Sequence, residues 1–164
     1  MADGITLEIE PVAVPSGCNV IVGGSHFIKT VQDVYEAVVE SGTAVKFGVA
    51  FCEASGKRLV RSDGNDPALV SAAEKTAMQL GAGHSFVVYL KDGFPVNVLN
   101  RIKSVSEVTT IYAASANPLQ VVVAESSQGR GILGVIDGSR PLGVETPADK
   151  VERVEFLRKI GYKR

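Results

Sequence analysis

Hydrophobic and polar positions along the chain predict eight strands. Residues 5–10 alternate apolar and polar side chains, the pattern of a strand with one buried face, and residues 19–22 form a short apolar run before two glycines. The same reading places further strands at residues 44–52, 57–61, 84–90, 95–99, 119–124 and 131–136. Glycine, proline or polar clusters separate most of these runs, as expected for turns.

Apolar residues at helical spacing predict four helices, each with a recognisable start. Thr30 is expected to cap the first, and Gly42 to end it. Asp66 is expected as N-cap of the second, with Pro67 at its first position and Gly81 after its last turn. Ser104 with Glu107 resembles a capping box for a third helix that ends at Asn117-Pro118, and Pro147 opens a fourth with the stripe Val151, Val154, Phe156, Leu157 and Ile160.

The predicted order is strand, strand, helix, repeated four times. Such an order differs from the single-strand alternation of a Rossmann fold. We therefore expect one α/β domain over residues 1–164, with a mixed, partly antiparallel sheet and helices packed on it.

Composition supports a globular protein and excludes some partners. Hydrophobic residues make up 45% of 164, charged residues 21%, and the net charge is −1. That balance gives no electrostatic basis for binding nucleic acid or membrane. No signal peptide or membrane-spanning run is seen, so a cytoplasmic protein is expected. Cys18 and Cys52 are interpreted as buried thiols, and no spacing of Cys and His suggests a metal site.

Both histidines follow glycines and precede an aromatic residue. His84 stands in Gly81-Ala82-Gly83-His84-Ser85-Phe86, and His26 in Gly23-Gly24-Ser25-His26-Phe27. Glycine lets a ligand approach the backbone closely, and an imidazole can act as a nucleophile near neutral pH. A structural histidine at a turn is the simpler alternative, although the flanking glycines favour a function for His84.

A glycine-rich segment, Gly129-Arg130-Gly131-Ile132-Leu133-Gly134, fits the spacing of a dinucleotide fingerprint. The residues after it predict a strand end and a turn instead of a helix, so we reject that interpretation. No Walker-type phosphate loop occurs in the sequence. Gln128, Gly129, Arg130 and Gly131 could still present backbone amides and a guanidinium to an anion, while a flexible polar hairpin is about as plausible.

Polar residues near predicted strand ends form a third set of candidates, because ligands commonly gather at such ends. Those retained as candidates are Lys29, Asn97, Arg101, Asn117 and Asp137.

Several long segments carry a resemblance to a known family. They include Lys46-Phe47-Gly48-Val49-Ala50-Phe51-Cys52-Glu53-Ala54-Ser55-Gly56, the two histidine segments, Asn97-Val98-Leu99-Asn100, Ala116-Asn117-Pro118, the 129–138 segment and Ile160-Gly161-Tyr162-Lys163. Together they resemble the adenosine-specific kinase family over nearly the whole chain.

The resemblance implies binding of adenosine and AMP, and a stably phosphorylated histidine. We assign the phosphate to His84, with His26 as the alternative. ATP is then the expected phosphoryl donor and brings Mg²⁺, Arg130 is expected to bind phosphate oxygens, and Asp137 to orient a hydroxyl. The alternative function is a non-catalytic adenine-nucleotide sensor carrying a phosphohistidine. The resemblance also implies a homo-oligomer, with a trimer favoured.

Overall fold

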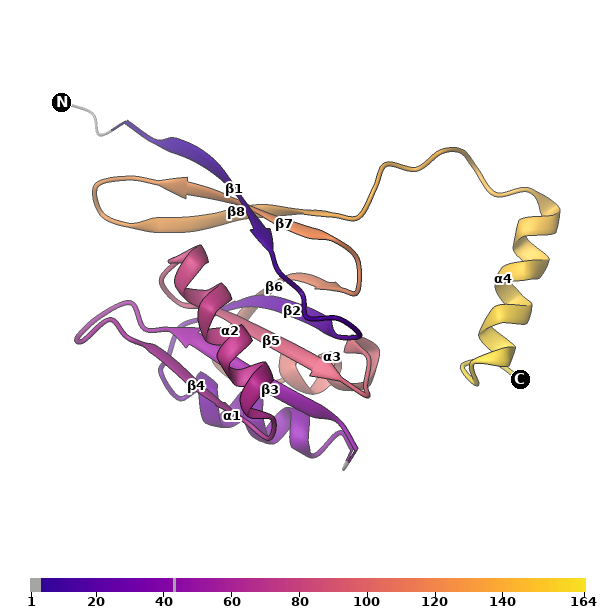
Figure 1. The fold of residues 1–164 in the computed structure, drawn as a ribbon, viewed down its shortest axis with the longest axis horizontal. Coiled ribbons are helices and arrows are strands. Elements are labelled where there is room, and N and C mark those ends of the chain that lie inside the picture. The colour runs from indigo at the N-terminus through magenta and orange to yellow at the C-terminus, as the bar shows by residue number, and fades with distance from the viewer. Residues whose placement is uncertain (1–3, 43) are drawn as a thin grey trace.

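The computed structural model describes residues 4–42 and 44–164 (Figure 1). Its strands are β1 (Thr6–Val12), β2 (Asn19–Ser25), β3 (Lys46–Cys52), β4 (Val60–Gly64), β5 (Ser85–Lys91), β6 (Val108–Ser115), β7 (Leu119–Glu125) and β8 (Arg130–Asp137). Its helices are α1 (Thr30–Val39), α2 (Pro67–Leu80), α3 (Pro95–Lys103) and α4 (Pro147–Lys159). The expected α/β fold with four helices is confirmed for these residues.

The strands form two sheets with antiparallel ladders throughout. The larger sheet has the order β4-β3-β5-β2-β6, and the smaller has β1-β7-β8. In the larger sheet, the carboxyl ends of β2 and β3 lie beside the amino ends of β5 and β6. We call this row of strand ends the histidine edge, because His84 and His26 both lie there.

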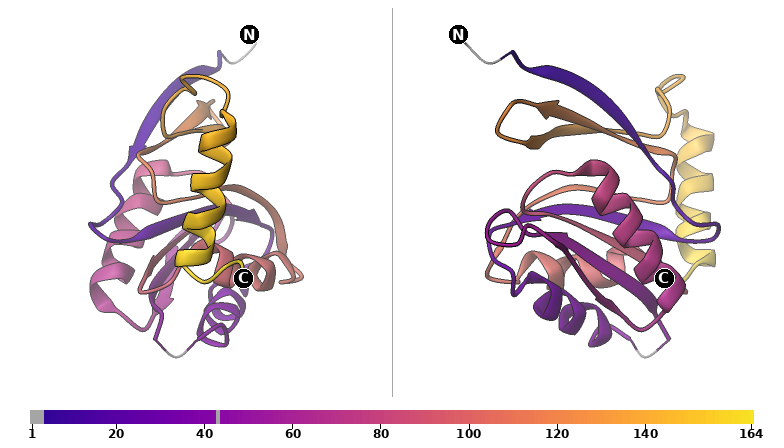
Figure 2. Two further views of the ribbon diagram at one scale, coloured as in Figure 1. Left: turned by 90° about the vertical axis from the view of Figure 1, so that its right-hand side faces the viewer. Right: turned by 60° about the vertical axis from the view of Figure 1, so that its left-hand side comes forward.

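Two apolar cores lie on the two faces of the larger sheet. One core packs α1 and α3 against side chains such as Phe47, Phe51 and Phe86. The other core fills the space between the opposite face, α2 and the smaller sheet, with residues such as Val87, Leu80 and Val121. The order of layers is therefore α1 and α3, the larger sheet, then α2 with the smaller sheet (Figures 1 and 2).

Helix α2 begins and ends where the sequence predicts. The Asp66 carboxylate accepts hydrogen bonds from the backbone N–H groups of Ala68 and Leu69, at 2.9 and 3.1 Å. Gly81 closes the helix in the left-handed conformation, with φ of 58°. The start of α2 rests on β3 at Gly48, where an added Cβ would lie 2.2 Å from the Val70 nitrogen. Only glycine fits this contact without moving the helix.

The predicted order of elements is wrong between residues 95 and 115, in the third predicted unit. Residues 95–103 form helix α3 where a strand was expected, because Val98 and Ile102, four positions apart, are both fully buried against the sheet. Residues 108–115 form strand β6 where a helix was expected. Their run of Val, Thr, Thr, Ile and Tyr is typical of strands, and pairing with β2 outweighs the helical spacing.

The predicted cap at Thr30 is also wrong. Thr30 is the first residue of α1 and lies fully buried, while Lys29 occupies the cap position. The Thr30 hydroxyl donates to the Phe27 carbonyl oxygen and contacts the Ser25 hydroxyl at 2.7 Å. The hydroxyl therefore anchors the turn between β2 and α1.

Helix α4 stands apart from the rest of the chain, although its apolar stripe was expected to face the protein's own core. None of its residues is buried, because the segment 138–146 leads away from the sheets before the helix begins (Figures 1 and 2). Val151, Phe156 and Ile160 are between 45% and 58% exposed. We call residues 139–164 the C-terminal arm.

Candidate functional site

A cleft of about 670 Å³ opens between three parts of the fold: the loop from β3 to β4, the end of α2, and the β7–β8 hairpin. Its volume lies within the range of small-molecule sites. Its walls are formed by Ile5, Cys52, Glu53, Ala54, Arg58, Leu59, Val60, Ala77, Met78, Gly81, Gly83, Ala124, Glu125, Ser126, Gln128, Gly129, Arg130 and Gly131. The structure therefore brings the predicted segment Gln128–Gly131 to a cavity next to the Gly81–Gly83 turn.

The glycines of the hairpin leave free space beside the backbone at this cleft. Ser126 and Gly129 exchange backbone hydrogen bonds of 2.9 and 3.2 Å, which close the turn. Gly131 lies in a strand, and a Cβ added to it would meet no atom within 4 Å. Packing therefore does not require glycine at 131, whereas close approach of a ligand to the backbone would.

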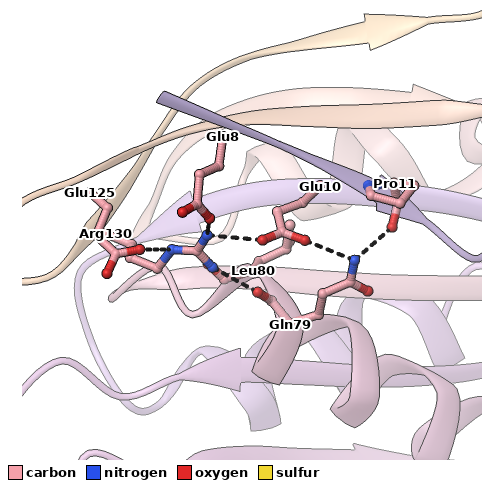
Figure 3. A network of polar contacts seen from close by, with 7 residues as sticks. All are labelled: Glu8, Glu10, Pro11, Gln79, Leu80, Glu125 and Arg130. Atoms are coloured by element: carbon pink, nitrogen blue, oxygen red, sulfur yellow. Dashed lines mark hydrogen bonds and ion pairs between the residues drawn. The ribbon is translucent and has the colours of Figure 1, made fainter. Parts of the chain in front are cut away.

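Arg130 joins the hairpin to β1 and α2 (Figure 3). Its guanidinium forms ion pairs with Glu8, with Glu10 at 2.9 Å and with Glu125 at 3.0 Å. It also donates to the carbonyl oxygens of Gln79 and Leu80, at 2.8 and 3.0 Å. The guanidinium is thus shared among three carboxylates and the last turn of α2.

The network makes Arg130 the link between the smaller sheet, whose three strands all contribute to it, and the end of α2. The hydrogen bond from Arg130, followed by that from Gln79, holds the pKa of the Glu10 carboxyl below its ordinary value of 4.5. Binding of phosphate by Arg130 stays a prediction. To contact a phosphate, the guanidinium would have to exchange one of these five contacts.

His84 occupies the histidine edge in a strained conformation. Its φ is 63°, which is uncommon for a residue with a Cβ. Its N–H donates to the Cys52 carbonyl oxygen at 2.8 Å, and its own carbonyl oxygen accepts from Ser25 N–H at 2.9 Å. The imidazole stacks on Phe51, with ring centroids 5.9 Å apart and planes 15° apart.

The ring of His84 and the cleft lie on opposite faces of β3. Phe51 belongs to the core beneath α1 and α3, whereas its neighbour Cys52 belongs to the other core and lines the cleft. Gly83 lines the cleft directly before His84. His84 therefore directly follows a residue of the cleft wall, but its imidazole lies on the other side of the sheet from the cleft.

His26 and Lys29 lie at the same edge, next to Glu107, whose buried carboxylate was not predicted from the sequence. His26 is exposed, and its N–H donates to the Glu107 carbonyl oxygen at 3.1 Å. Lys29 pairs with Asp33 at 2.8 Å and lies 3.8 Å from the Glu107 carboxylate. Glu107 is 2% exposed, and neither carboxylate oxygen accepts a hydrogen bond from any described residue. Nothing in the local sequence distinguishes it from a surface glutamate.

The remaining predicted residues lie away from the cleft. Asn97 accepts the Phe94 N–H in the first turn of α3, and Arg101 pairs with Glu40 beside a separate hollow between α1 and α3. Asp137 accepts hydrogen bonds from Ser115 and Asn117, at 2.5 and 3.3 Å. Since β8 begins at Arg130 and ends at Asp137, these two ends are about 24 Å apart along the strand.

The cleft side chains that were not anticipated from the sequence include Ile5, Arg58, Leu59 and Met78. Three are large apolar residues exposed by 47% to 69%, and Arg58 has a positive φ of 51°. A local pattern does not show that these positions, from separate elements, converge on one cavity.

A comparison with protein families agrees with the resemblance seen in the sequence. The model of a family described as adenosine specific kinase matches residues 10–163. The chain belongs to the adenosine-specific kinase family. Membership in this family indicates an adenosine-related kinase function.

A crystal structure of the PH1918 protein from Pyrococcus horikoshii OT3 is similar over nearly its whole length. The two sequences are 43% identical, the match covers 98% of this chain and 99% of that one, and the TM-score is 0.94. Among curated proteins, none matches the chain. Within residues 4–42 and 44–164, no helix is long and apolar enough to cross a membrane.

Proposed function

We propose that this member of the adenosine-specific kinase family binds adenosine and AMP in the cleft and transfers a phosphoryl group from ATP to adenosine. The observation that carries the proposal is the cleft itself, which combines apolar walls with the open backbone of the glycine hairpin. Apolar walls suit a purine, and the space beside Gly129 and Gly131 lets phosphate oxygens come close to the hairpin. We expect this reaction in the cytoplasm, where ATP is available.

The proposed carrier of the phosphoryl group is His84. A neutral imidazole nitrogen attacks the γ-phosphorus of ATP, the bond to the β-phosphate oxygen breaks, and ADP leaves. The 5′-hydroxyl of adenosine then attacks the same phosphorus, the P–N bond breaks, and AMP forms as the hydroxyl proton is released. The strained backbone of His84 and its place directly after Gly83 support this choice. His26, which follows Ser25 at the same edge, is the alternative carrier.

Magnesium is expected to arrive with ATP. Mg²⁺ is commonly held by substrate phosphates together with one or two carboxylates. Glu53 and Glu125 line the cleft and are the carboxylates that fit this role. No group of three or more His, Cys, Asp or Glu residues suited to a metal ion gathers in the described parts of the chain.

An adenine-nucleotide sensor with a stable phosphohistidine is the second candidate. The stacking of His84 on Phe51, away from the cleft, favours it, because a phosphoimidazole facing away from the cleft would pass its phosphoryl group to adenosine only slowly.

Quantifying AMP formed per chain separates the two functions. The protein is incubated with γ-labelled ATP, with and without adenosine, and AMP and the intact mass of the chain are measured. A kinase forms many AMP molecules per chain, whereas a sensor gains at most one phosphate per chain.

The two histidines are distinguished by substitution. His84→Asn is expected to abolish acid-labile labelling, with His26→Asn as the matched control. If only the His26→Asn variant loses labelling, His26 is the residue that carries the phosphoryl group. AMP formed without labelling would indicate direct transfer, and neither product would refute both functions.

We also propose that the chain forms a homo-oligomer, with a trimer favoured, through the C-terminal arm. The outer face of the smaller sheet exposes Leu7, Ile9 and Leu133 by 57% to 66%, and α4 exposes its own apolar stripe. Each surface is apolar and uncovered within one chain, so α4 of one copy suits the sheet of another.

Removing residues 139–164 tests the assembly. Light scattering at micromolar concentration should show an oligomer for the full chain and a monomer for the shortened one. A monomeric full chain would refute the assembly.

A further inference from the structure

We propose that Arg58 anchors the phosphate of AMP in the cleft, and that Leu59 and Met78 hold the purine. This inference rests on the proposed function, because it concerns the orientation of the nucleotide that the cleft would bind. It assigns the charged contact to a residue outside the glycine-rich hairpin.

The two cations among the described residues that line the cleft differ in their contacts. Arg130 pairs with three carboxylates and donates to two carbonyl oxygens. The Arg58 guanidinium is exposed and has no ion pair or hydrogen bond with any described side chain. An anion in the cleft therefore meets Arg58 without breaking an existing contact, whereas binding to Arg130 would leave carboxylates unpaired.

The backbone at Arg58 is strained and is held by hydrogen bonds on both sides, which is more typical of a positioned residue than of a solvated one. Its φ is 51°, a conformation that residues with a Cβ rarely adopt. Arg58 N–H donates to the Ser55 carbonyl oxygen at 3.2 Å, and Leu59 N–H donates to the Glu53 carboxylate at 3.1 Å. Glu53 is itself paired with Arg61 at 3.1 Å. These contacts fix both sides of Arg58 and leave its side chain on the wall of the cleft.

The remainder of the cleft provides an apolar end. Leu59 and Met78 are 47% and 67% exposed, and both line the cavity beside Ala77. Large exposed hydrophobic residues that converge on one cavity mark a binding surface, and the flat face of a purine is a suitable occupant. Arg58 adjoins Leu59 in the chain, so a nucleotide with its base on Leu59 has a cation next to it.

Calorimetric titration of adenosine and AMP tests this orientation. Arg58→Gln should weaken AMP binding about tenfold or more, the loss of a charged hydrogen bond, while adenosine changes less than about twofold. Lys57→Gln is the matched control, because Lys57 is an exposed cation of the same loop that does not line the cleft. Met78→Asp should weaken both ligands alike, and circular dichroism would verify that each variant is folded.

The outcomes separate this inference from the proposed function. If Arg58→Gln keeps the ratio of AMP to adenosine affinity seen in the unaltered protein and in Lys57→Gln, Arg58 is not the anchor, although the function stands. If Met78→Asp changes neither affinity, the purine lies elsewhere. If the unaltered protein binds neither ligand, the proposed function and this inference both fail.

Discussion

Replacing Arg130 by glutamine should show how strongly one side chain couples the smaller sheet to helix α2. The change removes the positive charge that three carboxylates share and weakens the contact with the last turn of α2. The guanidinium is 17% exposed and Glu10 is 19% exposed, so this pair is screened only partly by water. Glu8 and Glu125 are each 46% exposed and contribute less.

The expected loss follows from these contacts. A hydrogen bond to a charged group contributes about 1.5–3 kcal/mol, and each carbonyl contact about 1 kcal/mol. Glutamine retains some of this bonding, so we expect a loss of about 3 kcal/mol in the free energy of unfolding. For a domain of this size that corresponds to roughly 6–12 °C in Tm.

Urea unfolding followed by circular dichroism measures this loss. Arg101→Gln is the matched control, because its pair with Glu40 is more than half exposed on both sides and should contribute below about 0.5 kcal/mol. A double-mutant cycle of Arg130→Gln with Glu10→Gln should give a coupling of about 1–2 kcal/mol. A loss from Arg130→Gln no larger than that from Arg101→Gln would show that Arg130 does not couple the smaller sheet to α2.

Two further predictions concern other parts of the fold. The lowered pKa of Glu10 contributes stability that is present above about pH 4.5 and is lost as pH falls through the folded-state pKa, so Glu10→Gln should flatten the acid limb of a Tm-versus-pH curve; an unchanged limb would contradict this. Asp66→Ala should lower the free energy of unfolding by about 1 kcal/mol in urea, because two N–H groups of α2 lose their acceptor, whereas Asp63→Ala on β4 should have a much smaller effect.

The sequence predicted best those elements whose ends are marked by local chemistry. Asp66, Pro67 and Gly81 bound α2 because each acts on the backbone within a few residues. The reversal of α3 and β6 has the opposite cause. Val108, Ile111 and Tyr112 fit a helix locally, but the pairing of their strand with β2, a segment far away in the sequence, decides the outcome. Such pairing leaves no trace in a short window of sequence.

The candidate site shows the same division between local and distant information. The glycines of the hairpin mark open backbone near the cleft, and the sequence reveals them directly. The contrast between Arg130 and Arg58 depends on Glu8, Glu10 and Glu125, which approach from two other strands. The difference between the contacts of these two arginines therefore exists only in the folded chain.

The contact between Gly48 and the start of α2 fixes the position of the helix whose other end lines the cleft. An added methyl group would lie 2.2 Å from the Val70 nitrogen, so even Gly48→Ala would displace the first turn of α2. Fourteen residues of helix form a rigid rod of about 21 Å, and Gly81, directly beyond it, lines the cleft with Met78. A displacement at one end of that rod is carried to the other. The alignment of the binding walls is therefore set in part by the absence of one methyl group at the opposite end of the helix.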